Sequence, residues 1–100
     1  MIDKAQWKNL VQERLQRLYE QSGHEGKLQD VVIQIPPKPE LGDLAFPLFA
    51  FAKAFAKAPN LLSQELSADI NALADKPDGE AFAAGPYMNV RLNMNSQNIS

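Results

Sequence analysis

The feature that most constrains the fold is a strict alternation of apolar and polar side chains over residues 87–93. The two kinds of side chain take opposite faces, with Met88, Val90 and Leu92 against Tyr87, Asn89, Arg91 and Asn93. A period of two residues is typical of a β-strand with one buried face. Residues 81–84 can form a short strand before it, and the intervening Gly85-Pro86 predicts a turn. The C-terminal part of the chain is therefore expected to contribute to a sheet.

The N-terminal part follows a helical period instead. Its apolar side chains recur three and four residues apart, at Trp7, Leu10, Val11, Leu15, Leu18 and Tyr19. Asp3 is suited to cap this helix and Gly23 to end it. A further helix is expected to start at Pro59, with an inward stripe of Leu62, Leu66, Ile70 and Leu73. The chain therefore combines helices with strands.

Two central segments complete the pattern. The β-branched run 31–35 predicts a short buried strand, which Pro36-Pro37 ends. Residues 44–57 predict an alanine- and phenylalanine-rich helix with Asp43 as N-cap. The alternative has Phe46 as cap and Pro47 at the first helical position. This helix is apolar almost all round, so we expect it either to be buried on two sides or to await a partner, with Phe46 and Phe49 on the face away from Phe51 and Phe55.

Composition excludes most catalytic chemistry. The 100 residues contain no cysteine and a single histidine, His24, so neither a thiolate site nor a multi-histidine metal site can form. There is no glycine-rich phosphate loop, and no serine stands in a nucleophile-elbow pattern. We therefore expect no catalytic residue and no metal ligand in this chain.

Apolar run length and charge limit the partners. The longest apolar run, residues 44–52, is far shorter than the roughly 20 residues that span a bilayer, so we expect a soluble cytoplasmic domain. The sequence has 10 basic and 12 acidic side chains, whereas a protein that holds nucleic acid by phosphate neutralisation alone is strongly basic. A nucleic-acid role must therefore depend on reading individual bases, or form a small part of a larger binding surface.

The polar face of the last strand is the one arrangement that suggests a binding chemistry. Tyr87 and Asn89 stand about 6.6 Å apart on the same side of a strand. A ring that stacks beside an amide that bonds a base edge is a common way to read an unpaired base. Arg91 is placed to meet a phosphate or to pair with a carboxylate. On spacing alone, an ordinary half-exposed strand is the simpler interpretation.

Three segments together resemble one protein family. They are Ile35-Pro36-Pro37 with Gly42-Asp43-Leu44-Ala45-Phe46 and the helix to Lys57, then the helix start at Ala58-Pro59, and finally residues 84–92 with Gly85-Pro86-Tyr87 and Asn89. In this order and spacing they are similar to the N-terminal additional domain of arginyl-tRNA synthetase. The resemblance covers almost the whole chain, from the first helix to about Asn93.

The resemblance implies a two-layer α+β domain with about three helices packed on one face of a small, mostly antiparallel sheet. It implies that residues 1–93 recognise tRNA for arginine at the corner formed by the D-loop. The family's base-reading pair, an aromatic and an amide residue two positions apart, matches Tyr87 and Asn89. Arg91, on the same face, completes the expected tRNA-binding set.

Two further motifs are implied to be structural. Gly85 and Pro86 match the turn that presents the base-reading pair, and Gly42 and Asp43 match the entry to a helix. In that entry, we expect the glycine to supply the turn and the aspartate to cap the helix.

The family's catalytic and anticodon-binding domains have no counterpart in this sequence, so a piece of a longer ligase is implied. Residues 94–100 are then a polar tail or the start of a linker to the catalytic domain, for which ATP and Mg²⁺ are implied. No cofactor is expected in this chain. The rest of the synthetase is expected to sit on the face of Phe46 and Phe49. A stand-alone protein-interaction module that uses the same face is the alternative.

Overall fold

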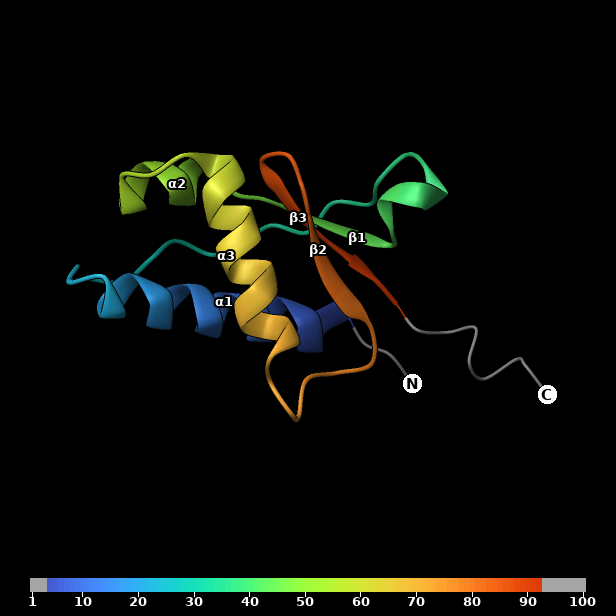
Figure 1. The fold of residues 1–100 in the computed structure, drawn as a ribbon, viewed down its shortest axis with the longest axis horizontal. Helices are drawn as coiled ribbons and strands as arrows, with labels where there is room; N and C mark the ends of the chain where they lie inside the picture. Colours follow the sequence, from blue (N-terminus) through green and yellow to red (C-terminus); the bar gives the residue numbers. More distant parts are fainter. Residues whose placement is uncertain (1–3, 93–100) are drawn as a thin grey trace.

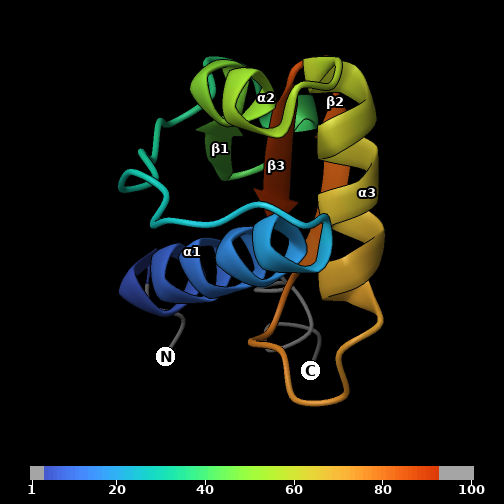
Figure 2. The same ribbon diagram turned by 90° about the vertical axis from the view of Figure 1, so that its left-hand side faces the viewer.

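The computed structural model describes residues 4–92 (Figure 1). Its helices are α1 Lys4–Gln21, α2 Phe49–Phe55 and α3 Pro59–Asn71, with a short 3-10 helix, η1, at Pro39–Leu41; its strands are β1 Leu44–Pro47, β2 Glu80–Ala84 and β3 Tyr87–Arg91. The three helices form a layer in front of the strands in Figure 2, which confirms the predicted α+β class. Asp3, Asn93 and the predicted tail 94–100 lie outside the described residues.

The sheet is antiparallel with the order β1-β3-β2, so β3 is the central strand. Its inner face meets the helices and carries five buried side chains, Leu44, Phe46, Ala81, Met88 and Val90. Its outer face carries the alternate residues. There Asn89 lies between Ala45 on β1 and Phe82 on β2. The apolar residues of the alternating pattern in β3 therefore face the helices, and the polar residues lie on the outer face of the sheet, as predicted.

Helices α1 and α3 fill the space against the inner face. The α1 stripe buries Trp7, Val11 and Leu15, and the α3 stripe buries Leu62, Leu66 and Ile70. Each fully buried side chain of this size contributes about 1.5–3 kcal/mol relative to an exposed one. Leu73, predicted in the same stripe, is half-buried beyond the end of α3. The core thus follows from the two helical periods.

The predicted buried strand 31–35 is wrong. Within the described residues this segment makes one isolated bridge to the sheet, between Gln34 and Ala45. Val32 and Ile35 are 53% and 65% exposed, respectively. The segment is extended, but it lies beside the sheet rather than in it.

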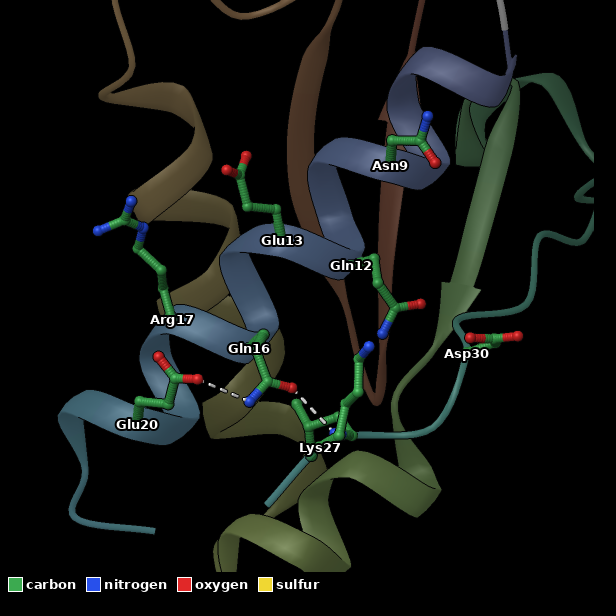
Figure 3. Close-up of a pocket in the computed structure, with 9 residues that line it drawn as sticks. Asn9, Gln12, Glu13, Gln16, Arg17, Glu20, Lys27 and Asp30 are labelled. Atoms are coloured by element: carbon green, nitrogen blue, oxygen red, sulfur yellow. Dashed lines mark hydrogen bonds between the residues drawn. The ribbon is translucent and has the colours of Figure 1, made fainter. Parts of the chain in front are cut away.

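Glutamine side chains on α1 bond backbone groups of the segment 26–31, which leads into this extended run (Figure 3). Gln12 donates through Nε2 to the Gln29 carbonyl and accepts through Oε1 from the Val31 amide, each at 2.8 Å. Gln16 bonds the carbonyl of residue 26 and the amide of residue 28 in the same way. Buried or half-buried backbone groups need partners, and here α1 supplies the partners that a neighbouring strand normally offers.

The predicted single helix over residues 44–57 is also wrong. Leu44–Pro47 is β1, paired with β3, and α2 is confined to Phe49–Phe55. A short apolar run suits either state, and here the edge of β3 offers hydrogen-bond partners that favour a strand. Phe46 consequently points into the core and is fully buried, so it does not form an exposed face with Phe49.

The remaining elements follow the predictions. Pro59 begins α3 with Ala58 at the N-cap, and β2 and β3 flank the turn at Gly85-Pro86. No helix within residues 4–92 has both the length and the apolar character needed to cross a membrane.

Candidate functional site

Tyr87 and Asn89 line one cavity of about 290 Å³ on the outer face of the sheet. Strands β1, β2 and β3 form its floor, and the extended segment before β1 forms its wall. The lining residues outside this pair are Gln34, Ile35, Pro36, Pro37, Leu41, Ala45 and Ala84. The structure therefore brings together the two residues that the spacing singled out, and it encloses them with a proline-rich segment.

Asn89 lies at the bottom of this arrangement rather than on an open surface. Its side chain is on the outer face, yet the residue is only 3% exposed because the segment 34–41 covers it. Its Nδ2 donates to the Leu41 carbonyl at 2.8 Å. Its Oδ1 is buried and has no hydrogen-bond partner within residues 4–92. Most buried polar atoms are paired, so this acceptor is a candidate ligand contact.

Tyr87 is half-buried, and its ring packs against Phe49. The two ring centroids are 5.7 Å apart and the planes are nearly perpendicular, at 89°. Phe49 is the first residue of α2 and is 53% exposed. Such edge-to-face pairs stabilise the orientation of both rings, so α2 holds the tyrosine in place. Helical spacing alone did not reveal this contact, because it joins two elements distant in the sequence.

Arg91 does not line the cavity. Its guanidinium lies 4.8 Å from the centroid of the Phe82 ring, and Nη2 donates to the Glu40 carbonyl at 3.0 Å. Together with the bond from Asn89 to Leu41, this contact attaches η1 to β3. Two polar residues of β3 thus fix the wall of the cavity.

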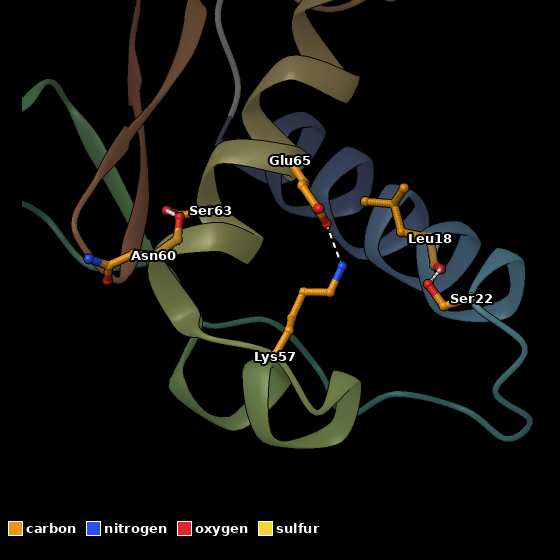
Figure 4. A network of polar contacts seen from close by, with 6 residues as sticks. All are labelled: Leu18, Ser22, Lys57, Asn60, Ser63 and Glu65. Carbon is orange, nitrogen blue, oxygen red and sulfur yellow. Dashed lines mark hydrogen bonds and ion pairs between the residues drawn. The ribbon is translucent and has the colours of Figure 1, made fainter.

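Gly85 and Pro86 form the turn before Tyr87, as predicted, and two helices anchor this turn. The Gly85 carbonyl accepts from Ser63 Oγ of α3 at 2.7 Å, and the Pro86 carbonyl accepts from the Leu48 amide at 3.2 Å. Figure 4 shows Ser63 near the start of α3, on the side that faces this hairpin. Sequence reasoning missed Ser63, because a serine in a helix gives no sign of a bond 22 residues away.

Asp43 does not cap a helix, which corrects the predicted role of the Gly42-Asp43 motif. The Asp43 amide donates to the Val90 carbonyl at 2.7 Å, and its carboxylate accepts from the Leu92 amide at 2.8 Å. Gly42 has φ +89°, and a Cβ there would lie 2.7 Å from the Val90 carbonyl oxygen. The motif is structural, but it joins the chain to β3 instead of starting a helix.

A second, shallower hollow lies on α1 and is lined mainly by polar and charged side chains, among them Glu13, Arg17, Glu20, Lys27 and Asp30 (Figure 3). Its two glutamines already bond the neighbouring segment. Within residues 4–92, no group of three or more His, Asp or Glu side chains is arranged to hold a metal ion.

Known relatives have this domain as a small part of a longer protein. Residues 5–92 match the family model described as the arginyl tRNA synthetase N terminal domain. The arginine–tRNA ligase of Clostridium botulinum (strain Hall) is 45% identical over 83 residues, which are 83% of this chain and 14% of that protein. The arginine–tRNA ligase of Treponema denticola is 34% identical over 90 residues, which are 89% of this chain and 15% of that protein.

A solved structure agrees with these relatives. The arginyl-tRNA synthetase of Thermus thermophilus superposes with a TM-score of 0.57 at 26% sequence identity, over 89% of this chain and 14% of that chain. The sequence, the family match and the fold all lead to the same conclusion, that this chain belongs to the arginyl-tRNA synthetase N-terminal domain family.

Proposed function

We propose that this domain binds tRNA as the N-terminal part of an arginine–tRNA ligase, with Tyr87 stacking on an unpaired D-loop base and Asn89 bonding the edge of that base. The observation that carries the proposal is the shared cavity of Tyr87 and Asn89, in which Asn89 Oδ1 has no partner among the described residues. The relatives supply the substrate class, since they are arginine–tRNA ligases.

The free acceptor of Asn89 defines which base edge the cavity favours. Nδ2 is already used by the Leu41 carbonyl, so Oδ1 is the atom left for a ligand. A buried acceptor without a partner costs about 1–3 kcal/mol, which a bound N–H group recovers. The site therefore favours a base edge that presents an amino or imino N–H, and it disfavours an edge that presents acceptors alone.

The aromatic part of the site supplies affinity with little dependence on base identity. Tyr87 is half-buried, and Phe49 supports it at 5.7 Å. Stacking of a base on such a ring is worth about 1–3 kcal/mol. In this proposal Arg91 acts through the wall of the cavity, because its guanidinium holds the Glu40 carbonyl.

The proposal assigns no chemical step to this chain. ATP and Mg²⁺ serve the ligase reaction, and residues 4–92 do not fit them, since they show neither a glycine-rich phosphate loop nor a cluster of metal ligands. We place both in the rest of the parent enzyme, and we expect that enzyme to act in the cytoplasm. The polar segment 94–100 stays a predicted linker outside the described residues.

The experiment is a matched set of protein and RNA changes in the full-length parent enzyme. Tyr87→Ala and Tyr87→Phe are compared for binding to arginine tRNA transcripts, either intact or with one D-loop base removed in turn. We expect Tyr87→Ala to weaken binding by about 5- to 150-fold, which corresponds to about 1–3 kcal/mol, and Tyr87→Phe to bind nearly normally.

Comparing these transcripts identifies the base that stacks on Tyr87. For the wild-type enzyme, removing that base should lower the affinity as much as Tyr87→Ala does. For Tyr87→Ala, removing the same base should lower the affinity no further. If Tyr87→Ala instead loses affinity equally for every transcript with a missing D-loop base, Tyr87 does not stack on such a base and the proposal is wrong.

A further inference from the structure

Residues of α2 continue the aromatic surface away from the cavity. Phe49 contacts Tyr87, and Lys53 lies one helical turn further along the same side. Phe49, Lys53 and Lys57 all line a shallow hollow of about 490 Å³ between α2 and the start of α3. We call these three residues the α2 strip, although Lys57 lies just beyond the end of α2. Its hollow is lined otherwise by small residues and a proline, and by no carboxylate.

The two lysines of the strip differ in their ion pairing, and Figure 4 shows the ion pair of Lys57 with Glu65. Lys57 Nζ lies 2.5 Å from Glu65 Oε1 of α3, with 25% and 43% of the two side chains exposed. Lys53 is exposed and forms no ion pair with any described residue. The strip therefore presents one free positive charge, and a second that is neutralised by a neighbour.

The opposite end of the sheet differs from the α2 strip in that it carries several carboxylates among its basic side chains. Glu80 lies across from Arg91 in the register, and Asp75 and Asp78 stand on either side of Lys76 in the segment that leads into β2. Asp43 bonds the chain just after Arg91. A polyanion that enters at Tyr87 meets carboxylates at this end, whereas the hollow beside α2 is lined by two lysines and no carboxylate, so the α2 side is electrostatically favoured.

We propose that the RNA backbone next to the base held by Tyr87 runs along the α2 strip, with a phosphate bound by Lys53. This inference rests on the proposed function, and it adds a binding residue and a direction for the RNA. Phosphate contacts position nucleic acid, whereas base contacts specify it, so the strip and the cavity divide these two roles.

Salt dependence isolates phosphate contacts, because each neutralised phosphate adds to the slope of log K against log salt. The binding of full-length parent enzyme to arginine tRNA is therefore measured from about 50 to 200 mM salt. For Lys53→Gln we expect a slope smaller by about 0.7–0.9, so the fourfold rise in salt costs it about threefold less affinity than it costs wild type.

Two further variants make the test specific. Glu65→Gln releases Lys57 from its ion pair, so we expect tighter binding and a steeper slope. Lys8→Gln is the matched control, because Lys8 is exposed next to Trp7, whose indole donates to the Asp78 carbonyl at the acidic end of the domain. It makes the same change of charge and should leave the slope unchanged.

Tyr87→Ala separates this inference from the proposed function. It should lower the affinity and keep the wild-type slope, because stacking releases no counterions. A wild-type affinity for Tyr87→Ala overturns the proposed function and this inference together. A weakened Tyr87→Ala with an unchanged slope for Lys53→Gln overturns this inference alone, because Lys53 then binds no phosphate. An equal loss of slope in Lys8→Gln also overturns it, since the charge then acts at long range.

Discussion

The side-chain amide of Asn89 donates to the main-chain oxygen of Leu41 at 2.8 Å, across 48 positions of sequence. One half of the amide thus holds the wall of the cavity while the other half, Oδ1, is left without a partner among residues 4–92. A single side chain both builds the cavity and offers it an acceptor. Any change at Asn89 therefore tests stability as well as binding.

Asn89→Asp is expected to destabilise the fold by about 2–3 kcal/mol at neutral pH, because an oxygen replaces the donor that faces the Leu41 carbonyl. Burial raises the pKa of the new carboxyl above its unfolded value. The penalty is therefore smallest in acid and grows as the pH rises through about 4. Urea unfolding of the chain at several pH values measures it. A penalty that does not change with pH contradicts the buried position.

Gly42→Ala is expected to cost about 3 kcal/mol or more, and Gly85→Ala about 1 kcal/mol. Both glycines have positive φ, of +89° and +61°, so both substitutions are strained. At Gly42 the new Cβ also lies 2.7 Å from the Val90 carbonyl oxygen, whereas at Gly85 nothing lies within 4 Å. Thermal unfolding of the two variants separates the steric clash from the strain of φ. Equal losses would show that the approach of Gly42 to β3 has no cost.

Ser63→Ala is expected to loosen the turn that carries Tyr87. Ser63 Oγ donates to the Gly85 carbonyl at 2.7 Å, and its removal costs about 1 kcal/mol. Amide hydrogen exchange at residues 85–87 should become faster. Ser67→Ala is the control, because Ser67 bonds the Ser63 carbonyl within its own helix. If Ser63→Ala and Ser67→Ala change the exchange rate at the turn equally, the bond from Ser63 to the Gly85 carbonyl does not stabilise the turn.

Arg14→Met is expected to destabilise the fold by about 1 kcal/mol, because Arg14 joins α1 to Asp69 of α3 through two bonds of 2.7 and 2.9 Å. The side-chain hydrogen bond to Asp69 raises the pKa of Arg14. A raised pKa stabilises the fold at every pH below the unfolded value and is lost only in strong alkali. The difference from wild type should therefore be the same between about pH 6 and pH 9. A double-mutant cycle with Asp69→Asn checks that the pair is responsible.

The helical and alternating periods predicted most of the core. Trp7, Val11 and Leu15 on α1, and Met88 and Val90 on β3, are buried as their spacing indicates. These residues lie in long, periodic elements, where the local pattern and the tertiary structure agree.

Shorter segments took their structure from partners that are distant in sequence. Leu44–Pro47 is a strand because β3 pairs with it. The run 31–35 lies beside the sheet, and Gln12 of α1 bonds its first residue, Val31. The candidate site likewise depends on contacts that the sequence pattern does not reveal. Spacing placed Tyr87 and Asn89 on one face, but it gave no sign that η1 covers Asn89 or that Phe49 supports Tyr87.

The central place of β3 has a consequence during synthesis. Pro47 pairs with Tyr87, and a ribosome that adds about 5–20 residues per second needs roughly 2–8 s to make the chain between them. During that interval Leu44 and Phe46 of β1 have no β3 to pair with. The segment that later forms the wall of the cavity also lacks Asn89, which bonds the Leu41 carbonyl in the finished fold. The cavity of Tyr87 and Asn89 is therefore completed only after β3 has been made, and a piece of this sequence that ends before Tyr87 cannot form it.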